Sequence, residues 1–260
     1  MTLFARRLAL LLALPFVAVA AARAEKPYAP LAAEIGAAGT PPADLLARAK
    51  AVAEAAHAGS AEEIFAFLPD RPTVILSGIT LGVPRRIEKK GPYVDATSAL
   101  AAIGLSYTEG EPIAPAGKKI DMTASRVKTA METIGDLLAA AKWGRDPLVP
   151  EAWCTARGVR WDAMAAKKAG LGGARGVYVT EPVTARPAAD GASVKARLKP
   201  GFLHALDADD EDGLTAIVLP DGSIVRVPTA KVGDAMPWGL CFEKRGAAGW
   251  LLTTFVSALN

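Results

Sequence analysis

The composition of the chain changes sharply near residue 170. From Thr40 to about Lys168 the sequence is rich in alanine and its apolar residues recur at helical spacing, whereas after Gly176 it consists of Val, Leu and Thr runs separated by turns. Apolar residues that recur every three or four positions indicate a helix, whereas apolar residues at every second position indicate a strand. The two parts of the chain therefore favour different kinds of element. We therefore expect an α+β protein with a mostly helical N-terminal domain at 25–169, a flexible linker at 170–176 and a strand-rich domain at 177–260.

The first 24 residues have the parts of a secretory signal peptide. A basic start precedes the apolar run 8–20, and Ala22 and Ala24 are small residues at the two positions that specify cleavage. The run is shorter than a membrane span and a proline interrupts it. We expect cleavage before Glu25, a periplasmic or secreted protein, and no membrane span after cleavage.

Removal of this segment changes the charge balance. The full chain has 30 basic and 27 acidic residues, and the segment carries three arginines and no acid, so 27 basic and 27 acidic residues remain. Binding to phosphate backbones requires clustered positive charge. We therefore expect no nucleic-acid partner.

Local signals place several elements before residue 170. Helices are indicated by apolar faces at helical spacing and by capping residues, and one strand by a β-rich run. The predicted elements are a helix from Thr40 to Gly59, a short helix opened by a capping box at Ser60 and Glu63, a strand within Thr73–Leu81, and a helix from Thr123 to Trp143 that ends at Gly144.

The expected mature chain contains two cysteines, Cys154 in the helical region and Cys241 in the strand-rich region. An even number of cysteines in an oxidising compartment favours a disulfide. Such a bridge would join the two regions and contribute on the order of 3 to 5 kcal/mol by closing a long loop. The alternative is two separately buried thiols.

The familiar catalytic patterns are absent. The sequence has neither a His-Glu-x-x-His helix nor a Gly-x-Ser-x-Gly elbow, and the context Ala-Trp-Cys-Thr around Cys154 is not that of a cysteine peptidase. The two histidines, His57 and His204, are expected to be surface or satisfied core residues rather than bases. We therefore predict no catalytic residue, no metal site and no cofactor.

Three other features of the sequence bear on function. The glycine-rich stretch 170–176 lacks the third glycine of a dinucleotide-binding loop, so no such loop is expected. The acidic run 207–213 has Asp212 at the position where a calcium-binding loop needs glycine. A solvated acidic loop is therefore expected at 207–213. A glycosidase needs two carboxylates at no fixed sequence spacing. That class stays open, with these candidate acids: Glu109, Glu111, Asp121 and Glu132.

About eighty C-terminal residues carry a family pattern. The segment 183–191 places Arg186 before a proline-containing turn, Lys199 lies in a lysine-proline-glycine turn, and an apolar run follows at 202–206. The end of the chain has a hairpin and a last strand within 238–256. In this order the motifs resemble bacterial SH3-like (SH3b) domains.

Two features depart from that family. Pro187 directly follows Arg186, where the family has small residues between, and the region 207–237 is longer than the family's loop. The extra length contains a hairpin signal, because apolar runs flank Pro220-Asp221-Gly222. An additional hairpin on the barrel is therefore expected.

The resemblance implies a small C-terminal SH3-like β-barrel that binds an envelope component, either a peptide, peptidoglycan or a protein. Its implied contact residues are Trp238, Trp250, Phe255 and Arg186, since aromatic residues at a barrel edge give rigid contact area. The competing interpretation is that Trp250 and Phe255 fill the barrel core. The expected function is that of an exported non-catalytic binding protein, and the alternatives are a carboxylate-dependent cell-wall hydrolase and a structural or inhibitory envelope protein.

Overall fold

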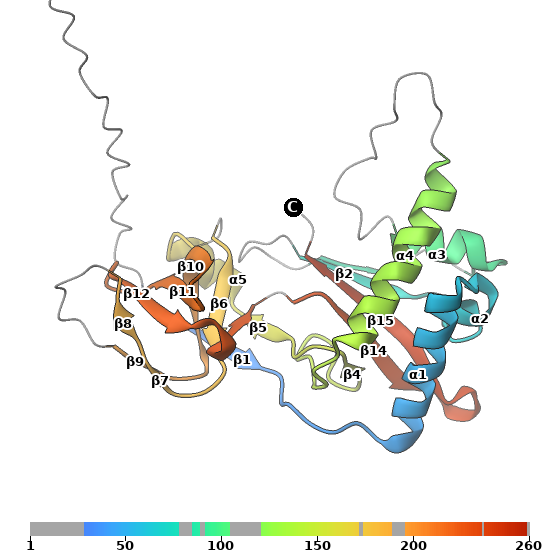
Figure 1. Ribbon diagram of the computed structural model, residues 1–260, viewed down its shortest axis with the longest axis horizontal. Helices are drawn as coiled ribbons and strands as arrows, with labels where there is room; N and C mark the ends of the chain where they lie inside the picture. The colour runs from blue at the N-terminus through green and yellow to red at the C-terminus, as the bar shows by residue number, and fades with distance from the viewer. Residues whose placement is uncertain are drawn as a thin grey trace, which may run out of the picture.

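The structure is a computed structural model that describes residues 29–77, 85–88, 92–104, 121–171, 174–188, 196–235 and 237–258. Figure 1 shows two groups of elements side by side, one with the helices α1 to α4 and a sheet, the other with the remaining strands and α5. The predicted signal peptide and the candidate acids Glu109 and Glu111 lie outside the described residues. Within these residues, no helix combines the length and apolar character that crossing a membrane requires.

The first group is built on a five-stranded sheet with the order β3-β2-β15-β14-β4. Its strands are β2 (Thr73–Ser77), β3 (Arg85–Glu88), β4 (Trp153–Cys154), β14 (Gly239–Lys244) and β15 (Trp250–Ala258). Strands β14 and β15 form an antiparallel hairpin, and β15 pairs in parallel with β2. The sheet therefore joins segments from the beginning, the middle and the end of the chain.

Alternate residues of these strands pack on opposite faces of the sheet. Leu240 and Phe242 belong to the core beneath the helices, whereas Cys241 between them faces a smaller cluster on the other side. In β2 the same alternation separates Val74 from Ile75. This is the two-residue period of a strand that is buried on both faces.

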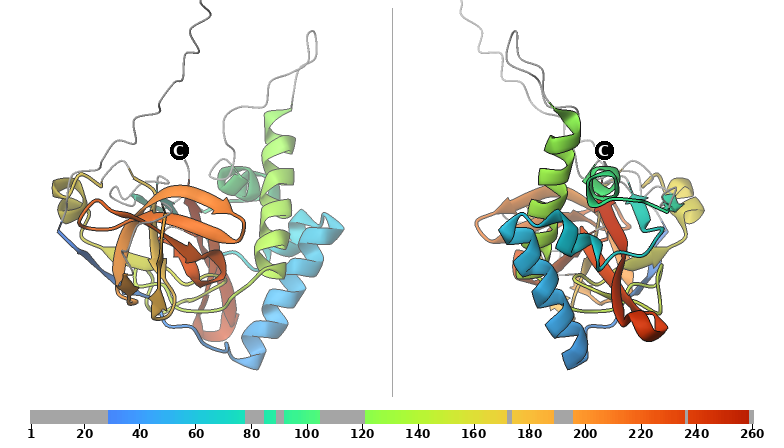
Figure 2. Two further views of the ribbon diagram at one scale, coloured as in Figure 1. Left: turned by 60° about the vertical axis from the view of Figure 1, so that its left-hand side comes forward. Right: turned by 90° about the vertical axis from the view of Figure 1, so that its right-hand side faces the viewer.

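Four helices cover one face of this sheet, as Figures 1 and 2 show from three directions. They are α1 (Ala43–Ala58), α2 (Ala61–Phe65), α3 (Ala96–Gly104) and α4 (Met122–Ala139). Helix α1 ends at Gly59, whose φ of 70° lies in the left-handed region that favours glycine. Asp121 caps α4 by accepting hydrogen bonds from two backbone N–H groups.

The predicted helices are present with shifted ends. Helix α1 begins at Ala43 and not at Thr40, and Ser60 precedes α2 without forming the expected side-chain cap. Helix α4 stops at Ala139. Gly144 does not terminate it but forms β-bridges to Ala38 and Cys154. The chain leaves the helix early because residues 142–144 pair with the extended segments on either side.

The second group contains an eight-stranded sheet, in which β13, β6, β10, β11, β12 and β8 follow one another. Strand β1 pairs with β10, and β5 pairs with β1. The strands are β1 (Leu31–Ile35), β5 (Val159–Trp161), β6 (Gly176–Val179), β8 (Arg186–Pro187), β10 (Phe202–Glu211), β11 (Leu214–Val218), β12 (Ile224–Pro228) and β13 (Val232–Asp234). The short strands β7 (Val183–Thr184) and β9 (Arg197–Leu198) pair beside it, and helix α5 (Ala163–Lys168) packs on it. A 3₁₀ turn, η1 (Thr229–Lys231), precedes β13.

The hairpin predicted around Pro220 is confirmed. Strands β11 and β12 pair antiparallel in continuous register, and Gly222 between them has a φ of 83°. The expected acidic loop at 207–213 is wrong in part, because β10 continues through Glu211 and turns at Asp212 and Gly213, both with positive φ. An Asp-Gly pair suits such a two-residue turn, which closes β10 onto β11.

The strand pairing differs from the predicted division of the chain. Strands β14 and β15, expected to close the C-terminal barrel, pair with β4 and β2, while β1 pairs with β10 and β5. The described part of the segment expected to be a flexible linker is packed, since Leu171 is buried in the second core and Ala174 packs against it. Mixed α+β architecture is confirmed, but the described strands do not form a closed barrel.

Candidate functional site

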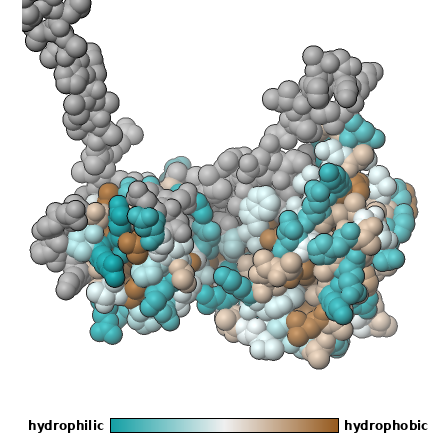
Figure 3. Space-filling model, in the orientation of Figure 1, coloured by the Kyte–Doolittle hydropathy of each residue, from teal (hydrophilic) through white to brown (hydrophobic). Residues whose placement is uncertain are grey.

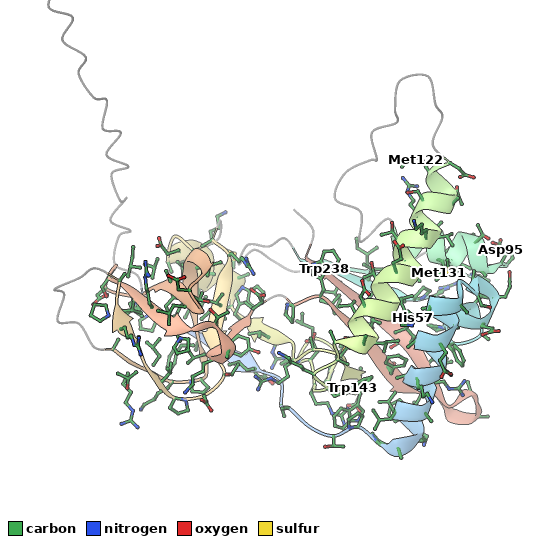
Figure 4. All side chains as sticks on the ribbon, viewed as in Figure 1. His57, Asp95, Met122, Met131, Trp143 and Trp238 are labelled. Carbon is green, nitrogen blue, oxygen red and sulfur yellow. A yellow bond between two sulfur atoms is a disulfide. The ribbon has the colours of Figure 1, made fainter. Side chains whose placement is uncertain are left out.

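The four residues predicted to bind a ligand lie in different parts of the structure. Phe255 and Trp250 are buried, but in the core beneath the helices and not in the barrel core that the competing interpretation predicted. Trp238 is partly buried and packs against both cores, and Figure 4 shows it between the two groups of elements. Arg186 is exposed on β8 in the second sheet. Phe255 has no exposed surface with which to contact a ligand.

The predicted disulfide is confirmed. Cys154 on β4 and Cys241 on β14 are directly opposed cross-strand partners with Cα atoms 4.0 Å apart. The backbone of Cys154 bonds to Gly144 on its other side, so this is a non-hydrogen-bonded pair, in which the side chains are close. The bridge ties the middle of the chain to its last hairpin.

A buried carboxyl group accompanies this disulfide. Asp146 is 3% exposed, and one of its oxygens lies within 4.8 Å of both sulfur atoms. It accepts a hydrogen bond from the Leu148 N–H at 2.8 Å, and burial raises the pKa of the Asp146 carboxyl group. A Cβ on Gly158 would overlap this carboxyl group, so only glycine leaves room for it. The two sulfurs are bonded to each other and buried, so the cluster acts as part of the packed junction.

The two histidines have different environments. His57 on α1 is exposed and donates a hydrogen bond from Nδ1 to the Ala53 carbonyl oxygen, and it faces α4 in Figure 4. This agrees with the expected surface role. His204 on β10 is 5% exposed, and both of its ring nitrogens lack a hydrogen-bond partner among the described residues. The expectation of a satisfied core histidine is therefore wrong for His204.

His204 lines a small cavity of 260 Å³ in the second group. The cavity is mainly apolar, and the residues around it are Pro30, Arg197, Leu198, Lys199, Phe202, Leu203, His204 and Pro220. They come from the turn of the β11–β12 hairpin, from β9 and the residue after it, from β10, and from the residue before β1. Buried polar groups without partners are uncommon in folded proteins and cost stability. One beside a cavity is the arrangement expected for a ligand site.

The mouth of the cavity combines charge with apolar surface. Arg197 and Lys199 are exposed, and neither forms an ion pair with a described residue. Phe202, at 40% exposed, is one of a few large apolar side chains on the described surface. On the face shown in Figure 3, apolar areas are small and separated by polar ones. Among the described residues, Phe202 is the one exposed large apolar side chain that lines this cavity.

A larger hollow of 810 Å³ lies on the helical side. It is bordered by the charged residues Asp70, Arg71 and Arg245, and Arg245 already pairs with Glu243 at 2.8 Å. None of the residues that line it has a buried polar atom without a partner. The His204 cavity is therefore the better candidate site.

The candidate hydrolase acids that the structure describes have other roles. Asp121 caps α4, and Glu132 forms an exposed ion pair with Lys128 one turn away on the same helix.

Comparisons with protein-family models, curated proteins and solved structures found no match. Function is therefore inferred from the chemistry of this chain.

We expect acid to destabilise the protein through His204. Burial lowers the pKa of His204 from 6.5 to about 4, so between these values the unfolded chain binds more protons than the folded one. The stability contributed by the neutral ring is complete above pH 6.5 and is lost as the pH falls towards 4. A pKa difference of this size corresponds to on the order of 3 kcal/mol.

Urea unfolding at pH 7.5 and 4.5 measures this effect. The loss of unfolding free energy between the two pH values should be smaller in His204→Leu than in the wild-type protein by on the order of 2 to 3 kcal/mol. His57→Leu is the matched control and should behave as wild type, because His57 is exposed. The opposite contribution of Asp146, whose raised pKa favours the folded state in acid, is common to all three proteins. Equal losses in all three would contradict the assignment.

Proposed function

We propose that this chain is an exported, non-catalytic binding protein that holds an apolar group of an envelope component in the His204 cavity. The observation that carries the proposal is the buried, unpartnered imidazole of His204 in an apolar cavity. Both ring nitrogens have almost no accessible surface, so a ligand that enters the cavity supplies the missing hydrogen-bond partner by displacing the side chains that cover the ring. The envelope component would be a peptide, peptidoglycan or a protein.

The lining of the cavity supports binding rather than catalysis. Its described lining residues include no serine, cysteine or carboxylate that could act as a nucleophile or as a second acid–base group. The low pKa of His204 also leaves the ring neutral at pH 7, where it is a weak base. Both properties suit a site that orients a ligand.

Two further features support the location and the module. The Cys154–Cys241 disulfide is typical of proteins in oxidising compartments, as the proposed export requires. The run of antiparallel strands from β6 to β13 supports the SH3-like resemblance for this part of the chain. Under this proposal the SH3-like module lies between β6 and β13, and β14 and β15 serve the helical side.

Co-sedimentation with purified peptidoglycan, combined with an assay for released fragments, tests the proposal. We expect wild-type protein to bind without releasing fragments. Phe202→Glu places a charge at the mouth of the cavity and should reduce binding at least about tenfold, because that loss corresponds to about 1.4 kcal/mol, less than full burial of an apolar side chain contributes. The matched control is Met164→Glu on α5, where a large apolar side chain is 58% exposed away from the cavity.

Each outcome decides between functions. Binding that is lost in Phe202→Glu and kept in Met164→Glu supports the proposal. Release of fragments would identify a hydrolase, and the absence of both binding and release would favour a structural or inhibitory protein. Equal binding by both variants would place the contact outside the His204 cavity.

A further inference from the structure

The geometry of the cavity points to a specific ligand chemistry: we propose that it recognises the free C-terminal carboxylate of a peptide whose last residue is apolar. This inference rests on the proposed function. It combines three observations, which are the two cations at the mouth that pair with no described acid, the buried imidazole of His204 beside the cavity, and the volume of the cavity.

The cations indicate an anionic group. Arg197 and Lys199 both border the cavity, and the lining residues that the structure describes include no aspartate or glutamate. Complementary charge at such a mouth favours a negatively charged ligand group and steers its approach. Arginine can bind a carboxylate through two parallel N–H···O hydrogen bonds, and hydrogen bonds between charged groups are the strong ones.

The imidazole indicates a group that can accept or donate a hydrogen bond. Neutral His204 offers one N–H donor and one acceptor nitrogen. A peptide supplies both kinds of partner, because its backbone has carbonyl oxygens, N–H groups and a terminal carboxylate. An entirely apolar ligand would leave both nitrogens unsatisfied, which the burial of His204 makes costly.

The volume limits the apolar part of the ligand. At 260 Å³ the cavity is slightly below the range of pockets that enclose a whole drug-sized molecule. It therefore suits one apolar side chain with its end group rather than a long acyl chain. Leu198 and the exposed face of Phe202 provide the matching apolar surface. The predicted occupant is the last residue of a peptide, with its carboxylate at the cations.

Isothermal titration calorimetry of the chain from residue 25 onward tests this assignment. The probes are N-acetyl-Ala-Ala-Leu as the free acid, the same peptide as the C-terminal amide, and N-acetyl-Ala-Ala-Asp as the free acid. We expect the leucine acid to bind at least about tenfold more tightly than either other peptide, which corresponds to about 1.4 kcal/mol. In the double variant Arg197→Gln/Lys199→Gln the preference for acid over amide should fall to near one.

Two controls complete the test. Lys167→Gln/Lys168→Gln removes two exposed cations from α5, outside the cavity, and should keep the acid preference. Deletion of residues 25–28 tests whether the chain that leads to Pro30 competes for the cavity. If the leucine acid binds only after that deletion, the occupant is the protein's own segment and the inference is overturned.

The remaining outcomes separate this inference from the proposed function. Equal binding of acid and amide, lost in Phe202→Glu, would overturn the carboxylate assignment and leave the binding function standing. Absence of binding by all three peptides would overturn the inference, and the co-sedimentation result would still decide the function. An acid preference that survives Arg197→Gln/Lys199→Gln would also overturn it.

Discussion

Removal of the disulfide by Cys154→Ala/Cys241→Ala is expected to lower the free energy of unfolding by about 4 to 5 kcal/mol. The bridge spans 87 positions in sequence, and without it the unfolded chain gains the freedom of a long open loop. It also holds β4 against β14, next to the buried Asp146. Urea or guanidinium unfolding of the double variant and the wild-type protein measures the difference.

Reduction of the wild-type protein provides the control. In excess dithiothreitol the wild-type protein should unfold at nearly the same denaturant concentration as the double variant, because both lack the cross-link. Non-reducing peptide mapping should recover Cys154 and Cys241 in one linked fragment. A loss below about 1 kcal/mol would show that the unfolded chain gains little from opening this loop.

Phe255→Ala is expected to destabilise the fold by about 3 to 5 kcal/mol without changing ligand affinity. Phe255 is fully buried in β15, in the core between the five-stranded sheet and the helices. Its removal leaves a cavity at the centre of a strand that pairs on both sides, where the backbone has little freedom to collapse. Thermal and denaturant unfolding measure the loss, and calorimetry with N-acetyl-Ala-Ala-Leu measures the affinity at a temperature where the variant is folded.

Phe202→Ala is the reciprocal control. Phe202 is 40% exposed and borders the His204 cavity, so its truncation should cost less than about 1.5 kcal/mol in stability and should weaken peptide binding. If Phe255→Ala abolished binding while the protein remained folded, Phe255 would be a ligand contact, as the family resemblance implied. If Phe202→Ala left affinity unchanged, the cavity would not be the site.

Elements with strong local signals could be predicted from the sequence. The stop of α1 at Gly59 needs a left-handed residue, and the β11–β12 hairpin is encoded by Pro220-Asp221-Gly222. The disulfide followed from the number of cysteines and the expected compartment. In each case the determinant lies within a few residues or in a simple count.

The pairing of distant segments could not be predicted. Strands β15 and β2 are parallel and separated by most of the chain, and a parallel pair has no turn whose residues announce it. The last strands have alternating apolar residues whether they close a barrel or complete a helix-covered sheet. The arrangement of these strands follows from the packing of Phe255, Phe242 and Leu252, whose side chains are buried against the apolar faces of α1 and α4.

The candidate site was missed for a related reason. His204 lies in an apolar run between Leu203 and Ala205, and this pattern indicates that it is buried. Whether a buried histidine has a hydrogen-bond partner depends on strands that are brought together only by folding, so the sequence did not reveal that His204 lacks one. The nearby Lys199 was interpreted as part of a turn, and Arg197 was not singled out. The signal available in the sequence was the position of these two cations just before the apolar run 202–206 that contains His204.

Nuclear magnetic resonance of ¹⁵N-histidine tests the central claim most directly, because the whole chain contains two histidines. At pH 7 the ring signals of His204 should be those of neutral imidazole, and they should shift when N-acetyl-Ala-Ala-Leu is added while those of His57 stay in place. His57 is exposed on α1, away from the cavity, and serves as the internal reference. Saturating peptide that leaves the His204 signals unchanged, or shifts those of His57 instead, would contradict the account.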